Sequence, residues 1–186
     1  QNTFDVTGHN ADLKFGAVNI GTQNRNADLT NVFSFDTGIL EMASLNASSK
    51  GANGFTTTSI INIGGGIVNT GAWTLASNTG PGSAIATANL IGGAINFSGN
   101  FLSGNNTSSG TATATVNIAG AAVNMGGFTL GSATNPVTLN LTGGSISNLG
   151  ELNGGGDGAL ATINKQGTNT IAFGGTSSYT GFTNVN

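Results

Sequence analysis

The chain has 186 residues, of which 32 are Gly, 26 Asn, 26 Thr and 16 Ser. Only 6% of the residues are charged and the formal net charge is −3, whereas ordinary globular domains are roughly 25% charged. Four scattered Lys and Arg residues are too few to neutralise the phosphates that a nucleic-acid-binding protein contacts, so no nucleic acid is expected as a partner. The absence of Cys excludes disulfides, thiolate metal sites and cysteine nucleophiles.

Length and hydropathy favour one folded domain. Hydrophobic residues make up 37% of the chain and the mean hydropathy is +0.09, so the low hydrophobicity and high net charge of disordered chains are not present. No run of 18 apolar residues predicts a membrane helix, and no charged segment followed by an apolar one predicts a signal peptide. Because the chain starts at Gln1 without Met, we expect a mature or excised portion of a longer exported protein.

Charge divides the chain into three regions of one continuous domain. Residues 1–51 carry eight of the eleven charged residues, 52–150 carry none, and 151–186 carry three. We expect charged, irregular coils in the first region, a regular uncharged solenoid in the second and a final coil in the third. A long uncharged stretch stays soluble through its Asn, Thr and Ser side chains or packs against neighbours.

Short strands are expected in the first region. Apolar residues alternate with polar ones at 13–20 on either side of Gly16, which predicts a pair of strands. A second strand-turn-strand unit is predicted over 32–46, because its apolar run at 39–45 is too short for a helix and begins after Gly38. No segment shows a convincing helical period of 3.6 residues.

An internal repeat dominates the central region and is the main indication of the fold. Related sequences occupy 62–69 (NIGGGIVN), 89–96 (NLIGGAIN), 117–124 (NIAGAAVN) and 140–147 (NLTGGSIS). Their first Asn residues are 27, 28 and 23 positions apart. The first and third copies align further without a gap, which matches Trp73 with Phe128 and Leu75 with Leu130.

Each repeat contains three short alternating segments separated by Gly, and a unit of this size cannot bury its own apolar side chains. Stacked units can, since each coil pairs with its neighbours at about 4.8 Å. The sequence therefore predicts an all-β fold, a right-handed parallel β-helix (β-solenoid) of about seven coils of 23–28 residues. An antiparallel sandwich is the alternative, although clear two-residue hairpin signals are absent.

Stacking predicts inward files of equivalent side chains and ladders of Asn near the corners, where left-handed dihedrals and amide-to-amide hydrogen bonds suit Asn. The predicted inward files are Ile63, Leu90, Ile118 and Leu141; Val68, Ile95, Val123 and Ile146; and Trp73, Phe101 and Phe128. The predicted ladders are Asn62, Asn89, Asn117 and Asn140; and Asn69, Asn96 and Asn124.

The C-terminal residues 164–186 carry a distinctive motif, in which Lys165, Gly167 and Thr168 precede an alternating strand and Tyr179-Thr-Gly precedes Thr183-Asn-Val-Asn. This segment resembles the repeat of autotransporter-associated β-strand proteins. Phe182 stands where that family usually has a second Gly. The resemblance implies a surface-displayed or secreted β-helical stalk of a large bacterial protein.

Residues with catalytic or metal-binding chemistry are few, and we expect neither a catalytic site nor a metal site. His9 is the only His and has no nucleophile context, so it is expected on the surface. The acids Asp28, Asp36 and Glu41, with Arg25 or Lys14, are the one set that could act on a polysaccharide. Two facing carboxylates of a glycosidase would otherwise have to come from Glu151 and Asp157.

Two weaker patterns concern Ca²⁺ and Thr. The segment 154–160 (GGGDGAL) is similar to half of a calcium-binding nonapeptide repeat, but only one copy is present, so no cofactor is predicted for Asp157. Thr111, Thr113 and Thr115 alternate with Ala, and 56–58 is a run of Thr. A flat Thr array would suit ice binding, although Thr is also common on the exposed side of strands.

These observations predict a non-enzymatic extracellular structural or adhesin-like solenoid, located at a bacterial cell surface or secreted, as a stalk or self-assembling fibre subunit. Self-association is expected end to end or laterally, because open solenoid ends leave unpaired strand edges. A host or matrix glycan is a further possible partner. The alternatives are a carbohydrate-binding or carbohydrate-cleaving β-helix, and an ice- or surface-binding solenoid that uses its Thr rows.

Overall fold

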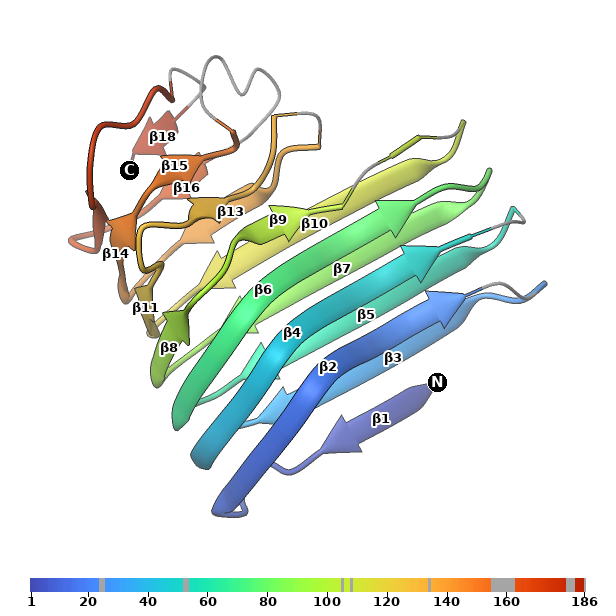
Figure 1. The fold of residues 1–186 in the computed structure, drawn as a ribbon, viewed down its shortest axis with the longest axis horizontal. Coiled ribbons are helices and arrows are strands. Elements are labelled where there is room, and N and C mark those ends of the chain that lie inside the picture. Colours follow the sequence, from blue (N-terminus) through green and yellow to red (C-terminus); the bar gives the residue numbers. More distant parts are fainter. Residues whose placement is uncertain are drawn as a thin grey trace.

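A computed structural model describes residues 1–23, 26–51, 54–104, 106–107, 109–133, 135–154, 163–179 and 183–185. Every regular element in these ranges is a β-strand, and the described strands pair in parallel throughout. The chain winds as a solenoid, so the expectation of a parallel β-solenoid is confirmed and the antiparallel sandwich is wrong (Figure 1). The right-handed sense of the winding stays a prediction.

The first sheet takes one strand from each passage of the chain and has eight strands in sequence order. They are β1 (Asn2–Asp5), β3 (Leu29–Phe35), β5 (Thr56–Ile63), β7 (Ser83–Leu90), β10 (Thr111–Ile118), β13 (Thr138–Leu141), β16 (Ile163–Lys165) and β18 (Thr183–Val185). The sheet runs without interruption through all three charge regions of the sequence.

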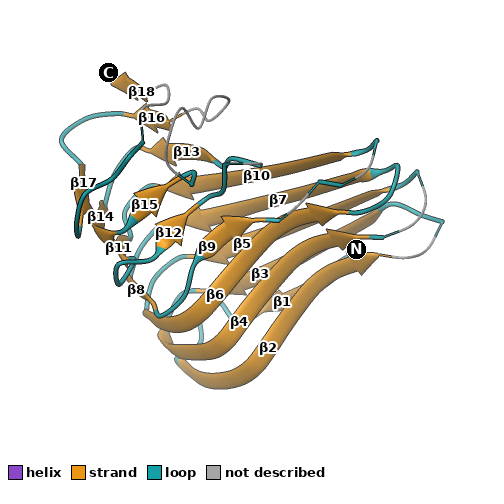
Figure 2. Ribbon diagram, turned by 45° about the horizontal axis from the view of Figure 1, so that its top comes forward, coloured by secondary structure: helices purple, strands orange, loops and turns teal. Residues whose placement is uncertain are grey.

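The second sheet is bent, which gives the solenoid three sides (Figure 2). Its long strands are β2 (Ala11–Gln23), β4 (Gly38–Lys50) and β6 (Ile67–Asn78). The two halves of β6 pair with separate strands of the following coil, β8 (Ala94–Phe97) and β9 (Phe101–Ser103). The remaining strands are β11 (Ala122–Asn124), β12 (Thr129–Leu130), β14 (Ser145–Leu149), β15 (Glu151–Leu152) and β17 (Thr170–Phe173).

Coil length shortens along the chain. Register partners are 29 residues apart between β1 and β3 (Phe4 and Phe33) and 27 apart between β5 and β7 (Ile61 and Ala88). They are only 20 apart between β16 and β18 (Ile163 and Thr183). The second sheet shortens in parallel, from thirteen residues in β2 to four in β17. The rod therefore narrows toward its C-terminal end (Figure 1).

The core consists of stacked inward side chains, because alternate residues of each strand point into the coil. Ile63, Leu90, Ile118 and Leu141 are successive register partners in the first sheet. Val68, Ile95, Val123 and Ile146 are successive partners in the second sheet. All eight side chains are at most 2% exposed, so each file is a continuous apolar column through the central coils.

The predicted aromatic file needs one correction, at Phe128. Trp73 pairs with Phe101 as expected, but the partner of Phe101 in the next coil is Leu130. Phe128 lies before β12, in a turn where its amide donates to Met125 O at 2.9 Å, and its side chain is only partly buried. Phe97 joins the cluster instead: its ring centroid lies 5.3 Å from Trp73 and 5.1 Å from Phe101.

Glycine allows the coils to approach closely at the corner between the two sheets. Gly66 and Gly93 occupy this corner in successive coils with φ of +73° and +80°. A Cβ on Gly93 would lie 2.4 Å from the carbonyl oxygen of Gly66. Both the left-handed backbone and the contact between coils therefore require Gly at position 93.

A polar file fills the interior at the opposite corner. Gln23, Lys50 and Asn78 are register partners and are at most 3% exposed. The Asn78 amide donates to Gly82 O at 2.6 Å and to Thr111 O at 3.0 Å. The Lys50 amine donates to Gly51 O at 3.4 Å. This file supplies hydrogen bonds to backbone groups of the loops that close each coil, as buried polar groups require.

Candidate functional site

An amide ladder runs along the outer surface of the first sheet. Asn89 donates to Asn62 at 2.9 Å, Asn117 to Asn89 at 2.8 Å and Asn140 to Asn117 at 2.7 Å. The ladder extends beyond the predicted residues, since Asn164 donates to Asn140 at 2.8 Å and Asn62 donates to the Ser34 hydroxyl at 3.3 Å. Each central amide thus both donates to one neighbouring coil and accepts from the other.

The ladder Asn residues lie within or at the ends of strands and none of them has a positive φ. The left-handed conformation expected of them is taken by corner Gly residues instead. In the second predicted ladder, Asn96 donates to Asn69 at 3.0 Å. Asn124 is the register partner of Asn96, but its side-chain oxygen accepts from Gly126 N and from Asn148 Nδ2, both at 3.0 Å.

The acids Asp28, Asp36 and Glu41 are not brought together. Asp28 accepts the amide of Thr56 at 2.8 Å, in the next coil. Asp36 accepts the amide of Gly8 at 3.0 Å, in the preceding coil. Each of these two carboxylates links a pair of neighbouring coils.

Glu41 instead forms an ion pair with Lys14 at 2.9 Å, and the hydrogen bond and charge of Glu41 raise the pKa of Lys14. Arg25, the other predicted cation, lies outside the described residues. Within the described ranges, no group of three or more His, Asp or Glu side chains could hold a metal ion.

Glu151 links the last coils. Its carboxylate accepts the amide and hydroxyl of Ser178 at 2.7 and 2.9 Å, the amide of Leu152 at 2.9 Å and the hydroxyl of Ser177. Burial favours the protonated form, but these hydrogen bonds outweigh it and lower the pKa of Glu151 to about 2. Asp157, its predicted partner and the candidate for Ca²⁺, lies outside the described residues.

His9 is exposed, in a turn at the N-terminal end. One ring nitrogen lies 3.0 Å from Thr7 O. The nearby Asp5 carboxylate accepts the Thr7 amide at 3.0 Å and the Thr7 hydroxyl at 2.8 Å. The amide bond, then the hydroxyl bond, lower the pKa of Asp5. These contacts stabilise the turn.

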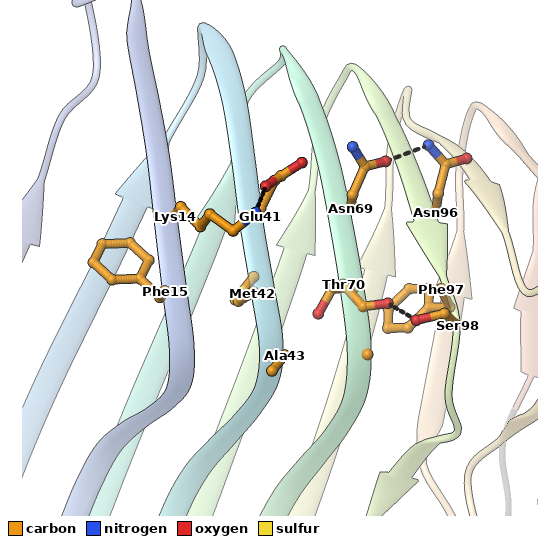
Figure 3. Close-up of a pocket in the computed structure, with 11 residues that line it drawn as sticks. Lys14, Phe15, Glu41, Met42, Ala43, Asn69, Thr70, Asn96, Phe97 and Ser98 are labelled. Carbon is orange, nitrogen blue, oxygen red and sulfur yellow. Dashed lines mark hydrogen bonds and ion pairs between the residues drawn. The ribbon is translucent and has the colours of Figure 1, made fainter.

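A shallow groove of about 470 Å³ follows the bend of β2, β4, β6 and β8. Figure 3 shows the Lys14–Glu41 pair at one end and the Asn69–Asn96 amides at the other. Phe15 is half-buried beside the ion pair. The groove thus offers a cation, an anion and two amides over four successive coils, groups that could bind hydroxyl-rich ligands.

The Thr runs occur in register on the outer side of the first sheet. Thr56 pairs with Ser83 and Ser83 with Thr111, and the Thr111 hydroxyl donates to that of Ser83 at 2.9 Å. Thr115 pairs with Thr87 and Thr138 in the adjoining coils. Thr57 faces inward and donates to Gly21 O at 2.9 Å. The outward rows repeat over more coils than the sequence indicated, because Ser83 and Thr87 join them.

No family model, curated protein or solved structure matches the chain. Among the described residues, no helix is long and apolar enough to span a membrane. The C-terminal motif forms strands β16 and β17 around a turn at Gly167, whose φ is +70°. Thr180, Gly181, Phe182 and Asn186 of this motif lie outside the described residues.

Proposed function

We propose that this chain is a rigid, non-enzymatic structural segment of an extracellular bacterial β-solenoid, serving as a stalk. The observation that carries the proposal is the continuity of its stacked contacts. The apolar files and the amide ladder pass through successive coils without a break from β5 to β13. A rod in which each coil contacts only its neighbours resists bending through the sum of such contacts.

The use of the charged side chains supports this proposal. Asp28, Asp36 and Glu151 each hold backbone amides of another coil or segment. Carboxylates positioned for general acid-base or nucleophilic chemistry face a substrate space with a partner group. Here they stabilise the stack, which fits a structural role better than a catalytic one.

The extracellular location rests on the C-terminal resemblance and on the composition. A chain without Cys needs no redox protection outside the cell, and its stacked hydrogen bonds replace disulfides as the source of stability.

The shape of the two ends bears on self-association. The second sheet ends in two short strands, the four-residue β17 and the two-residue β15. Stacking two copies head to tail would place these strands against the thirteen-residue β2 and leave more than half of the β2 edge unpaired. We therefore favour a stalk over a fibre that identical copies of this unit form end to end.

Rigidity can be tested directly because the chain contains no Cys. Asp12 and Ser145 lie in one outward file, five register steps apart. Spin labels on D12C and S145C should give one narrow distance distribution near 24 Å, since each step is about 4.8 Å. A broad distribution in the folded protein would contradict a rigid rod. The extracellular location is tested by treating intact cells that carry the parent protein with a protease or a label that cannot cross membranes. Modification of the protein only after the cells are lysed would contradict an extracellular location.

Glycan binding in the groove is a second candidate function, favoured by the ion pair and amides that line it. Amide and carboxylate groups bind sugar hydroxyls through paired hydrogen bonds. Binding to an array of glycans that is lost in E41A and N96A, but retained in N46A on another side, would support it. Equal binding by all four proteins, or none by the wild type, would contradict it.

A further inference from the structure

The outer face of the first sheet is unusually uniform, and it forms a feature separate from the stalk contacts. Three outward files lie next to the amide ladder, on β3, β5, β7, β10 and β13. Their residues are Thr56, Ser83 and Thr111; Thr30, Thr58, Ile85 and Thr113; and Val32, Ile60, Thr87, Thr115 and Thr138. Apart from Ser83, every member is β-branched. We call these twelve residues the threonine face.

The threonine face is a regular two-dimensional array. Its files repeat every 4.8 Å or so across the strands, and neighbouring files are separated by about 6.7 Å, the length of two strand residues. β-branched side chains have restricted χ1 rotamers, so their hydroxyl and methyl groups are held at fixed positions. Hydrogen bonds such as Thr111 to Ser83, at 2.9 Å, order the hydroxyls further.

The face is also free of charge over most of its area. No ionisable side chain occurs anywhere in 52–150. Asp28 lies at the edge in the first of these coils, and its carboxylate accepts the Thr56 amide at 2.8 Å. On the other edge the Asn62, Asn89 and Asn117 amides bond one another. The face therefore suits an uncharged ligand that itself repeats regularly.

The size and composition of the face disfavour other ligands. Its files span about 19 Å by 13 Å, on the order of 300–500 Å² with the side-chain margins. This is less than the ~800 Å² per partner of a standard protein interface. Ile85, 36% exposed, is its most exposed large apolar residue, and it carries no aromatic ring on which a sugar could stack. The occupant that fits is an ordered lattice of water.

We propose that the threonine face binds the surface of ice crystals. Hydroxyl groups held at fixed intervals can hydrogen-bond to ordered water molecules. The methyl groups between them carry no charge that would hold water in a different arrangement. Adsorption at many points of the array blocks further growth of the crystal plane. This binding activity goes beyond the structural role proposed above and does not depend on it.

The test is ice shaping and thermal hysteresis of the purified chain, measured against a buffer blank. We expect faceted crystals and a freezing point below the melting point. The variant T115K places a flexible charge in the face and should abolish both effects. The matched control T74K changes a half-buried outward Thr on β6, outside the face, and should retain them. Emission of the single Trp73 and thermal melting verify that each variant is folded.

Several outcomes would overturn the proposal. Unshaped ice with the folded wild-type chain would do so, and so would equal loss of activity in folded T115K and T74K. A concentration-dependent dimer in sedimentation, abolished by T115K while ice growth is unaffected, would assign the face to contact between copies instead. Ice binding by the wild type that T115K alone removes is the result we expect.

Discussion

Removal of one amide from the ladder is the sharpest test of what stabilises the stack. Asn89 lies at its centre, donates to Asn62 at 2.9 Å and accepts from Asn117 at 2.8 Å. The variant N89A removes both bonds at once. Two neutral hydrogen bonds contribute about 1 kcal/mol each, and because the partners are half-buried, water replaces part of the loss. We therefore expect the free energy of unfolding to fall by about 1.5 kcal/mol.

For a chain of this length such a loss lowers the melting temperature by about 3–6 °C. The assay is urea unfolding followed by Trp73 emission and by circular dichroism, whose coincidence tests two-state behaviour. The control is T87A, an outward change two residues earlier on β7, which loses only strand preference, at most about 1 kcal/mol. In the N62A/N89A double-mutant cycle the pair should show coupling of about 0.5–1.5 kcal/mol. If N89A costs no more than T87A and the coupling is zero, the ladder does not stabilise the stack.

Three further changes probe the core, the corner and the last coil. W73A should destabilise the chain by about 3–5 kcal/mol, because Trp73 is fully buried and its Nε1 donates to Thr70 at 2.7 Å. Since ~1 kcal/mol corresponds to ~2–4 °C in melting temperature, a melting temperature within ~2 °C of the wild type would contradict this prediction. G93A should lower the free energy of unfolding by about 1–3 kcal/mol more than G127A does. Both positions have a positive φ, but only a Cβ at position 93 would meet a backbone atom, 2.4 Å away. Equal urea midpoints for the two variants would refute the close approach of the coils. Glu151 has its pKa lowered from 4.5 to about 2, so its contribution to stability is complete above pH 4.5 and is lost as the pH falls toward 2. Protection against hydrogen exchange at residues 170–179, corrected for the intrinsic exchange rate at each pH, should therefore fall across that interval in the wild type. E151Q should be weakly protected at every pH, and a flat wild-type protection profile would show that the carboxylate does not hold this segment.

The central coils could be predicted because their repeats are nearly equal in length. The Asn spacing of 27 and 28 residues in the sequence is the register spacing of β5, β7 and β10. Phe128 was misplaced for a local reason. The gapless alignment with Trp73 treats 125–128 as strand, but Gly126 and Gly127 have φ of +58° and +85° and form a turn. That turn displaces Phe128, and Leu130 takes the inward position.

Burial of Lys50 could not be predicted from alternation along β4. Leu45 and Ala47 face inward, so strict alternation would place 49 inward and 50 outward. Ser48 instead has a φ of +55° and is itself fully buried. This local irregularity shifts the alternation by one residue and turns Lys50 into the core. Ala76 repeats the irregularity in the next coil, with a φ of +54°, which shows that the stack preserves the feature although neither sequence contains Gly there.

The groups that hold neighbouring coils together change along the rod, from carboxylates in the first coils to hydroxyls and amides in the central coils. In the first coils, carboxylates such as Asp12 and Asp28 accept backbone amides of the next coil, at 3.2 and 2.8 Å. In the file of Asp28 the following coils carry Thr56, Ser83 and Thr111, whose hydroxyls need no counterion. The amide ladder connects these coils without charge. Ten of the twelve residues of the threonine face lie in this uncharged middle part, and only Thr30 and Val32 come from the charged N-terminal region. The ice-binding proposal therefore rests mainly on coils that are joined without ionic groups.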